Sequence, residues 1–219
     1  MNIKDVRYWD RQFKRSEEDD FVNIHGTGSY EELKPLTGKV LDVACGDMDY
    51  LDSVKRAGDN YLVGLDFSKK ALKMAKKKTR GKGVALVRAA AQYMPFRDNA
   101  FDNVLCVELL HREAEYEKIL REIHRTSNSN AFLTLHHKDE AIKTNLKLEG
   151  NIAKEDGMIY TYFDEDEVLK MLETIGFGSA SIRVFRFEDI WEIPPTEPWP
   201  YYFPPRETKA VMQVECKKL

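Results

Sequence analysis

Short apolar runs alternate with amphipathic stretches through the middle of the chain. The runs lie at 40–43, 61–65, 84–87, 104–107 and 131–135. Their length and nearly continuous apolar character are typical of strands that are buried on both faces of a sheet. Stretches between them, such as 69–80 and 113–125, carry apolar residues at helical spacing. This alternation predicts a doubly wound α/β fold, in which helices cover both faces of a mostly parallel sheet.

The pattern weakens after 135 and then returns. Residues 140–160 are polar and predict no regular element. Acidic residues at 164–167 favour the start of a helix, which is expected to end at Gly176-Phe177. Strands are expected at 181–187 and 209–217.

One domain accounts for the whole chain, because 219 residues are enough to bury a core of their own. We expect an N-terminal helical cap over 1–35, a core over 36–187, a loop rich in proline and aromatic residues over 188–208, and a last strand over 209–219.

The composition is that of a soluble globular protein, with 42% hydrophobic and 32% charged residues. No apolar run approaches the roughly 20 residues that span a bilayer, and the first residues lack a signal-peptide pattern. The cysteines, Cys45, Cys106 and Cys216, lie in apolar stretches, and their odd number argues against a disulfide framework. We therefore expect a reduced, cytoplasmic protein with no membrane partner.

The net charge of −3 disfavours binding of a polyanion by the molecule as a whole. The helix expected at 69–80 nevertheless carries a basic stripe of Lys69, Lys70, Lys73, Lys76, Lys77 and Arg80. Such a stripe is usually a solvated helix face, and contact with RNA is the alternative. Nucleic acid is therefore a less favoured partner than a small molecule.

The first predicted strand ends in a turn that suits a nucleotide-like ligand. The apolar run breaks at Cys45-Gly46 and helical spacing follows. In doubly wound sheets, ligands bind at the carboxyl ends of the strands, where turns leave backbone N–H groups available. The second strand closes on Asp66, about 20 residues after Gly46, which is the spacing of a carboxylate that accepts hydrogen bonds from ribose hydroxyls. Such a carboxylate suits S-adenosylmethionine (SAM) or NAD.

Residues 40–48, V-L-D-V-A-C-G-D-M, resemble the motif V-L-D-x-G-C-G-x-G of the class I SAM-dependent methyltransferases. Ala44 and Met48 replace two of the family's three glycines. Ala44 is expected to be a mild change, because a methyl group often fits where a strand first bends. Met48 is a larger change, because the third glycine normally lets the backbone lie close to the cofactor.

Later segments resemble the same family. Asp66-Phe67-Ser68 matches D-x-S, whose serine caps the next helix. Residues 94–96, M-P-F, match the end of G-D-A-x-x-L-P-F, while Ala90 stands where the family's aspartate receives the adenine amino group. Residues 101–111 match F-D-x-V-x-x-x-x-x-L-H and place Glu108 and His111 just past the carboxyl end of a strand.

The family's R-x-L-K-P-G-G turn is replaced by residues 125–131, R-T-S-N-S-N-A. Asparagine tolerates the left-handed conformation that a glycine would take, so Asn130 is expected to preserve this turn.

The resemblance implies a seven-stranded sheet with an antiparallel last strand, and SAM as the methyl donor. It implies a cofactor site that contains Asp42, Ala44, Cys45, Gly46, Asp66, Phe67, Ala91, Gln92 and Glu108. A hydroxyl acceptor needs a general base, for which His111 is the first candidate and Glu108 the second. The alternatives are a structural hydrogen bond for His111 and a cofactor-orienting role for Glu108. The expected function is methyl transfer to an oxygen or nitrogen of a small molecule.

Other functions remain as alternatives. A nicotinamide dehydrogenase would want G-x-G-x-x-G after the first strand, which residues 44–49 lack. A scaffold that has lost catalysis is suggested by Met48, Ala90 and the missing Gly-Gly turn. An RNA or protein methyltransferase is a further alternative. No metal site is predicted, because the neighbouring His136 and His137 would point to opposite faces of a strand.

The two regions outside the core suggest a cover for the site. An N-terminal helix could close over SAM, with Arg7, Tyr8 and Trp9 as candidate contacts, or simply pack on the sheet edge. The aromatic loop over 188–205, which includes Trp191, Trp199 and Tyr202, is expected to form a wall of the acceptor site. Packing on the sheet edge or burial in a dimer is the alternative, so the chain is expected to be a monomer or a homodimer.

Overall fold

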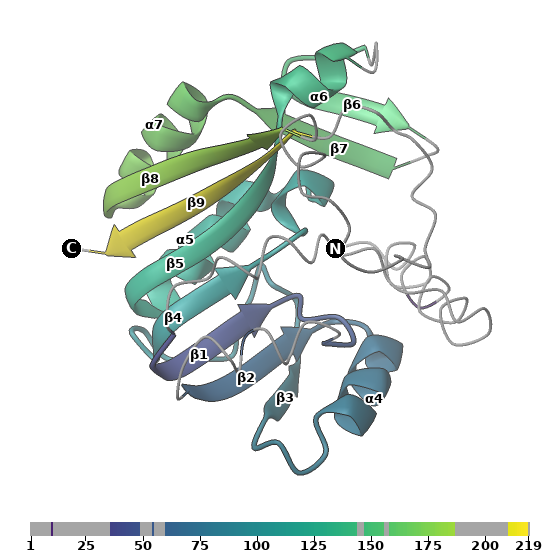
Figure 1. Cartoon of the computed structure of the whole chain (residues 1–219), viewed down its shortest axis with the longest axis vertical. Helices are drawn as coiled ribbons and strands as arrows, with labels where there is room; N and C mark the ends of the chain where they lie inside the picture. The colour runs from purple at the N-terminus through teal and green to yellow at the C-terminus, as the bar shows by residue number, and fades with distance from the viewer. Residues whose placement is uncertain are drawn as a thin grey trace, which may run out of the picture.

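The computed structural model describes residues 10, 36–48, 54, 60–143, 147–155, 158–186 and 210–218. Within this part of the chain the main sheet has the order β3-β2-β1-β4-β5-β9-β8 (Figure 1). Its strands are β1 (Gly38–Val43), β2 (Asn60–Asp66), β3 (Ala85–Arg88), β4 (Phe101–Cys106), β5 (Ser127–His137), β8 (Phe177–Arg186) and β9 (Ala210–Lys218). Strands β1 to β5 pair in parallel, and β9 is antiparallel to both of its neighbours. The predicted sheet is therefore confirmed.

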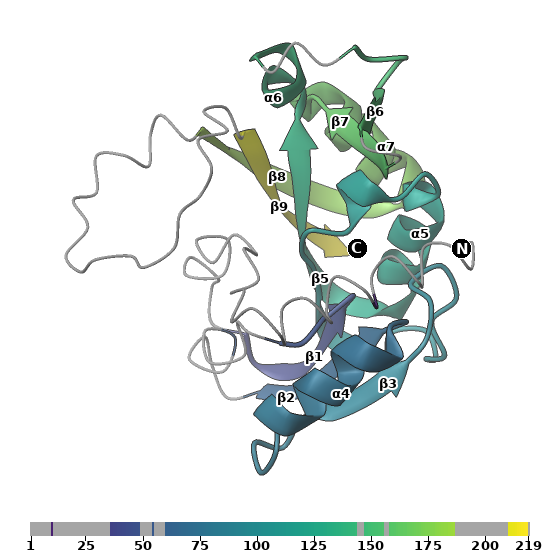
Figure 2. The ribbon, with the colours of Figure 1, turned by 90° about the vertical axis from the view of Figure 1, so that its right-hand side faces the viewer.

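The structure adds a hairpin that the sequence did not predict. Helix α6 (Lys138–Lys143) follows β5, and β6 (Ile152–Glu155) and β7 (Met158–Phe163) then form an antiparallel pair. Strand β7 continues the sheet through a short parallel pairing, His136 with Tyr162 and His137 with Phe163. Figures 1 and 2 both show α6 and this hairpin at one end of the molecule, opposite α4 and β3. Strand β6 lies in a polar stretch that gives little signal, whereas β7 has the apolar and aromatic sequence M-I-Y-T-Y-F, which could have indicated a strand.

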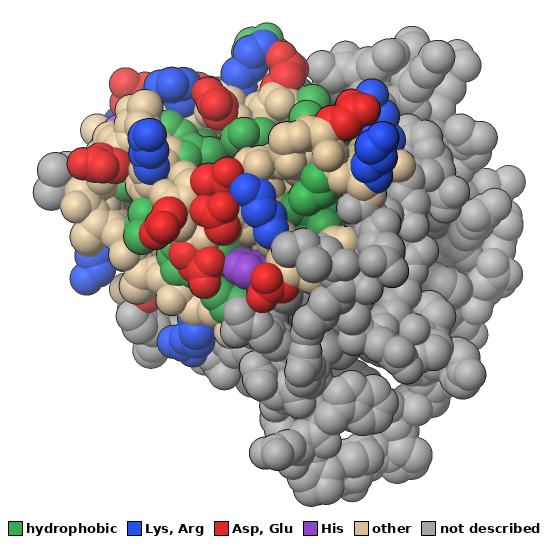
Figure 3. Space-filling view, turned by 90° about the horizontal axis from the view of Figure 1, so that it is seen from above, with side chains coloured by type: hydrophobic (Ala, Val, Ile, Leu, Met, Phe, Trp, Pro, Cys, Tyr) green, Lys and Arg blue, Asp and Glu red, His purple; other side chains and the backbone are tan. Residues whose placement is uncertain are grey.

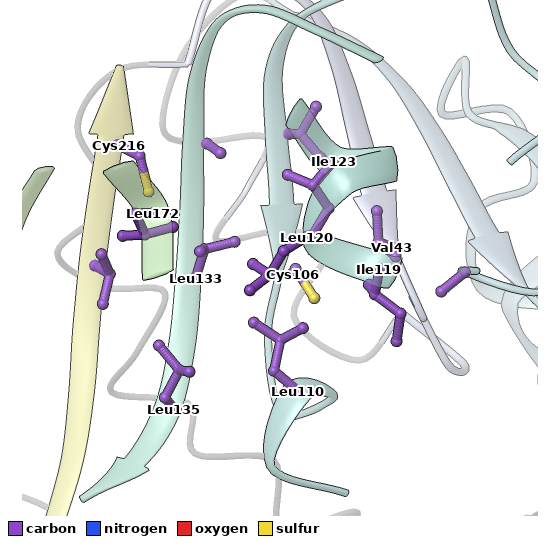
Figure 4. Packing of buried hydrophobic residues seen from close by; sticks show 14 of the residues in the cluster. Val43, Cys106, Leu110, Ile119, Leu120, Ile123, Leu133, Leu135, Leu172 and Cys216 are labelled. Carbon is purple, nitrogen blue, oxygen red and sulfur yellow. The ribbon is translucent and has the colours of Figure 1, made fainter. Parts of the chain in front are cut away.

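Successive side chains of the central strands enter opposite apolar layers. Leu41 and Val43 of β1 pack in the layer beneath α5 (Tyr116–Thr126) and α7 (Glu165–Ile175), whereas Val40 packs in the layer that contains Ala75 of α4 (Lys69–Lys78). Figure 4 shows Ile119, Leu120 and Ile123 of α5 turned toward the strands. All three are fully buried. The continuous apolar runs of the sequence are explained by this double coverage.

Helix ends follow the predicted capping chemistry. Ser68 Oγ accepts a hydrogen bond from the Ala71 N–H (3.1 Å) at the start of α4. Asp164 and Glu167 form a capping box at the start of α7, and Gly176 ends that helix with a φ of 112°. None of the described helices is long and apolar enough to cross a bilayer.

The turn expected at 125–131 does not form. Helix α5 ends at Thr126 and β5 begins at Ser127, where φ is −73° and ψ is 137°. Asn130 lies inside β5 opposite Asn103 and donates a hydrogen bond from its Nδ2 to Asn103 Oδ1 (3.0 Å). The left-handed conformation predicted for Asn130 was therefore wrong, because its side chain serves a cross-strand pair instead.

Arg125, near the end of α5, fixes the segment that contains the M-P-F motif. Its guanidinium donates to the carbonyl oxygens of Met94 (3.1 Å) and Phe96 (2.7 Å) and to Asp98 Oδ1 (2.8 Å). It also forms a two-nitrogen contact with the Glu122 carboxylate, at 2.7 and 2.9 Å. The loop from 94 to 98 is thus tied to α5 by one planar fork of donors.

Replacement of Arg125 with methionine should lower the free energy of unfolding by about 2–4 kcal/mol, because the Glu122 carboxylate and two carbonyls lose their donor together. Urea denaturation followed by circular dichroism measures the change. Arg121→Met, an exposed arginine on the same helix, is the control and should change stability by less than about 0.5 kcal/mol. Equal effects of the two substitutions would contradict the role of Arg125 in holding the loop from 94 to 98 against α5.

The predictions for residues 1–9, 11–35, 49–53 and 187–209 fall outside the described residues. These include the helical cap, the candidate lid at Arg7, Tyr8 and Trp9, and the aromatic loop. The domain boundaries and both covering roles stay predictions.

Candidate functional site

The turn after β1 holds two bulkier residues in a glycine conformation. Ala44 has a φ of 61°, Gly46 a φ of 54° and Met48 a φ of 60°. All three lie in the left-handed region, where an L side chain costs roughly 1–2 kcal/mol. Ala44 is therefore more than the mild change expected from the sequence. The Met48 side chain is almost fully buried and packs with Cys45 in the α4 layer, which compensates for its backbone strain.

Ala44→Gly should raise the free energy of unfolding by up to about 1 kcal/mol, because relief of the left-handed strain exceeds the added entropy of the unfolded chain. Chemical denaturation measures this gain. Ala85→Gly in β3, where φ is not positive, should instead destabilise the protein. A loss of stability in Ala44→Gly would show that the methyl group packs favourably enough to outweigh the strain.

Asp66 is the last residue of β2, and its carboxylate accepts hydrogen bonds from the backbone of two neighbouring loops. Its Oδ2 accepts from the Gly46 N–H (2.9 Å) and its Oδ1 accepts from the Ser68 N–H (2.7 Å). Burial, and to a smaller extent the nearby Asp10, raises the pKa of this carboxyl to about 6, against the opposing effect of backbone hydrogen bonds from Ser68, Gly46 and Phe67. Asp10 Oδ1 in turn receives the Ser68 hydroxyl (2.5 Å).

A shallow hollow at the carboxyl ends of β1, β2 and β3 adjoins Asp66. It is lined by Ala44, Leu65, Asp66, Phe67, Ala89, Ala91, Gln92, Leu109 and Glu113. The structure thus brings together five of the predicted cofactor residues, namely Ala44, Asp66, Phe67, Ala91 and Gln92, with Gly46 bonded to Asp66. Gln92 Nε2 donates to Glu113 Oε2 (3.1 Å), which links two of the lining residues. Glu113 was missed, although it follows the L-H motif by only two residues.

Three other predicted cofactor residues, Asp42, Cys45 and Glu108, do not line this hollow. Asp42 and Cys45 are each 1% exposed. The Cys45 N–H donates to the Leu65 carbonyl (3.0 Å), so this residue joins the ends of β1 and β2 through its backbone. Burial, with Asp42 and Asp66 nearby, raises the pKa of the Cys45 thiol well above its usual value. A neutral, buried thiol is a packing group here.

Beside the hollow, Glu108, His111 and His136 form a buried cluster. Glu108 Oε2 lies 3.7 Å from His111 Nε2 and 3.8 Å from His136 Nε2. The two imidazole rings stack with centroids 3.7 Å apart and planes inclined by 14°. Both histidines are nearly inaccessible, and the Glu108 side chain is 15% exposed. The structure therefore brings both candidate bases together and adds His136 to them.

The cluster is positioned by the ends of two adjacent parallel strands. Glu108 and His111 follow β4, with His111 in the short 3-10 helix η1 (Leu110–Arg112), and His136 lies near the end of β5. Glu108 has a φ of 58°, and its N–H donates to Thr134 Oγ1 of β5 (2.8 Å). A left-handed non-glycine residue held by its neighbours is a feature that recurs at functional sites.

The neighbouring His137 points elsewhere, as strand alternation predicts. Its Nδ1 accepts from the Asp139 N–H (3.1 Å), which places the proton on Nε2 and lets Nε2 donate to Glu165 Oε2 (3.0 Å). His137 is therefore a structural link between β5 and α7.

Comparison with known proteins agrees with this geometry. The family model "Methyltransferase domain" matches residues 41–135. The demethylmenaquinone methyltransferase of Geobacillus stearothermophilus is 35% identical over 94 residues, which are 41% of this chain and 40% of the relative. The chain thus matches less than half the length of this curated relative.

Solved structures share the fold. A SAM-dependent methyltransferase from Mesorhizobium loti superposes with a TM-score of 0.64 at 16% identity, over 87% of this chain and 96% of the other. One from Thermotoga maritima superposes with a TM-score of 0.63 at 16% identity, over 98% of both chains. The family match covers the turn after β1, Asp66 and the start of η1 together. Residues 41–135 match a methyltransferase domain, and the chain shares the fold of solved SAM-dependent methyltransferases.

Asp66, at the edge of the hollow, offers a hydrogen-bond acceptor of the kind that the ribose of SAM needs. SAM carries a ribose whose hydroxyls are hydrogen-bond donors, and Asp66 offers a buried carboxylate at the edge of the hollow. A carboxylate oxygen has lone pairs to spare after it accepts one N–H. Asp66 can therefore hold the Gly46 turn and accept from the ribose at the same time.

SAM binding by this methyltransferase fold should weaken by about tenfold between pH 7 and pH 5, because Asp66 then takes up a proton and loses acceptor capacity. Isothermal titration calorimetry at a series of pH values measures the change. Asp66→Asn cannot ionise, so its weaker affinity should not vary with pH. A pH-dependent loss of similar size in Asp66→Asn would assign the effect to another group.

This loss of affinity is separable from acid unfolding. The folded state holds the Asp66 proton more tightly than the unfolded chain does. This carboxyl therefore contributes most to stability at low pH, and its contribution falls as the pH rises from 3.8 to about 6. Asp66 itself thus gives the protein no reason to unfold at pH 5.

Proposed function

We propose that this protein transfers the methyl group of SAM to an oxygen or nitrogen atom of a small molecule. The observation that carries the proposal is the position of Asp66 and the Gly46 turn beside the buried cluster of Glu108, His111 and His136. A cofactor held at the first site and an acceptor held at the second would meet at the carboxyl edge of the sheet.

The chemistry asks the protein mainly for alignment. The sulfonium of SAM supplies an activated methyl group. Asp66 and the Gly46 turn bind the nucleoside, and residues such as Leu109 exclude water. Glu108 or His111 then takes the proton of the acceptor hydroxyl or amine.

A small acceptor is favoured over a polymer. The curated relative is named for demethylmenaquinone, which is a small molecule. The molecule is acidic overall, and the face seen in Figure 3 mixes basic and acidic side chains. The basic stripe of α4 is largely exposed, but Lys78 on that helix pairs with the buried Asp47 (2.7 Å) and serves the fold.

A scaffold without catalysis is the second candidate, and the turn after β1 favours it. Ala44 and Met48 occupy two glycine positions, and Ala90 removes the carboxylate that would receive adenine. These changes reduce the contacts available to the cofactor while leaving the fold intact.

Calorimetry with SAM and S-adenosylhomocysteine separates the two. The enzyme should bind both in the micromolar range and consume SAM in a screen of metabolite, tRNA and protein pools, with turnover in the metabolite pool. A folded protein with no measurable SAM affinity would support the scaffold. Turnover confined to the tRNA or protein pool would refute the small acceptor.

A further inference from the structure

The cluster of Glu108, His111 and His136 has the composition of a metal site. The ligand atoms of the three side chains all lie within 4.8 Å of one another. We propose that this cluster binds a divalent transition-metal ion. The sequence argument against a metal considered only the neighbouring His136 and His137, and so did not test His136 together with His111.

The donor set selects the kind of ion. Two imidazole nitrogens and one carboxylate oxygen suit Zn²⁺, Co²⁺, Ni²⁺ or Fe²⁺, because these ions accept nitrogen ligands readily. Mg²⁺ and Ca²⁺ prefer a shell made of oxygen atoms. Three protein ligands also leave coordination positions for water or for a bound molecule, as in catalytic rather than structural zinc sites.

The distances are close to those that an ion requires. Zinc bonds of about 2.0–2.2 Å at tetrahedral angles put neighbouring ligand atoms roughly 3.3 Å apart. The separations from Glu108 Oε2, 3.7 and 3.8 Å, exceed this by a few tenths of an ångström.

One side chain must also turn. The histidine rings are nearly parallel, so their nitrogen lone pairs do not yet converge on one point. Metal binding would require rotation of one imidazole about its Cβ–Cγ bond, a torsion that has a broad energy minimum.

The backbone conformation of Glu108 already holds this residue next to the two histidines. Its left-handed φ of 58° is unfavourable for a glutamate, and the hydrogen bond to Thr134 Oγ1 holds the residue there. If the two stacked histidines served only for packing, a glutamate with a strained backbone would not be needed beside them. Binding of a cation gives that carboxylate a reason to be there.

The ion would also deepen the function proposed above, on which this step alone rests. An acceptor oxygen that replaced water on the ion would release its proton to solvent water more easily, because a bound cation stabilises the oxyanion. Glu108 and His111 would then act as ligands of the ion, and no protein base would be needed. The substrate class would then be acceptors with an oxygen that can ligate a metal, such as phenols and enols.

The test is a titration of the chelator-treated, full-length protein with Co²⁺, followed by visible absorption, without SAM or acceptor. Wild type should show the d–d bands of protein-bound Co²⁺ at one equivalent, and Zn²⁺ but not Mg²⁺ should abolish them. His136→Gln and Glu108→Gln should weaken binding at least about tenfold. His137→Gln changes the adjacent buried histidine outside the cluster and should bind as wild type does.

The proposal is overturned if wild type shows no d–d bands, or if Glu108→Gln and His136→Gln bind Co²⁺ as tightly as wild type. Loss of binding in His137→Gln alone would place the ion at Glu165 and also overturn it. Circular dichroism checks the fold of each variant. Glu108→Gln should disturb packing least, because the Glu108 side chain is partly exposed. Because SAM is absent, a negative titration leaves the methyltransferase proposal intact, and absence of SAM binding leaves a positive titration intact.

Discussion

Replacement of Asp66 with alanine is expected to weaken SAM binding by roughly 30–150-fold, or about 2–3 kcal/mol, through loss of a charge-assisted acceptor for the ribose. The structure adds a second reason. Asp66 also anchors the Gly46 and Ser68 N–H groups, so its removal loosens the turn that the cofactor would approach. Calorimetry with SAM and S-adenosylhomocysteine measures both affinities.

Two comparisons make this result specific. Asp66→Asn keeps the shape and one oxygen, so its loss should be smaller than that of alanine. Asp166→Ala, an exposed residue in the first turn of α7, should leave SAM affinity unchanged. Wild-type affinity in a folded Asp66→Ala protein would remove Asp66 from the cofactor site.

Replacement of Glu108 with glutamine should lower kcat by about 10²–10⁴-fold, the usual range for loss of a proton-transfer group. The same fall is expected whether the carboxylate acts as the base or as a ligand of an ion, since the uncharged amide serves neither role well. SAM affinity should stay within about threefold of wild type, because Glu108 does not line the hollow beside Asp66. Kinetics with an acceptor from the metabolite screen, together with calorimetry, measure the two quantities.

This pair of measurements decides between the two roles predicted for Glu108. A loss of SAM affinity equal to the loss of kcat/KM would assign Glu108 to cofactor binding. His137→Gln provides the control, since His137 is bonded to Glu165 away from the cluster, and it should retain wild-type kcat.

The sequence was most informative where one local pattern determines the structure. The apolar run of β1, its turn and the acidic end of β2 predicted the sheet and placed Asp66, because strand burial and turn chemistry act over a few residues. Ser68 and Gly176 likewise marked helix ends that the structure confirms.

Features that depend on partners distant in the chain were not predictable in this way. His136 joins His111 only because β5 runs past the end of β4 in parallel register, and nothing within either segment encodes that meeting. Asn130 was assigned a turn because its own conformational freedom allowed one, but its partner Asn103 decided otherwise. The strain at Ala44 was also hidden, because a sequence motif does not report φ.

The pairing between β5 and β7 is short, so the hairpin next to His136 should open locally at a lower free-energy cost than the turn after β1. His136 and His137 contribute the only two register positions that join the hairpin to β5 among the described strands, and the buried Tyr162 opposite His136 packs its ring 5.9 Å away. Local opening of the hairpin would therefore remove the Tyr162 ring from His136, while β5 stayed paired to β9 and the β1–β2 turn and Asp66 stayed folded. A protein in that state should still bind the cofactor but should not transfer its methyl group. Hydrogen exchange at the hairpin would therefore measure how often the hairpin is open and the cluster is disturbed.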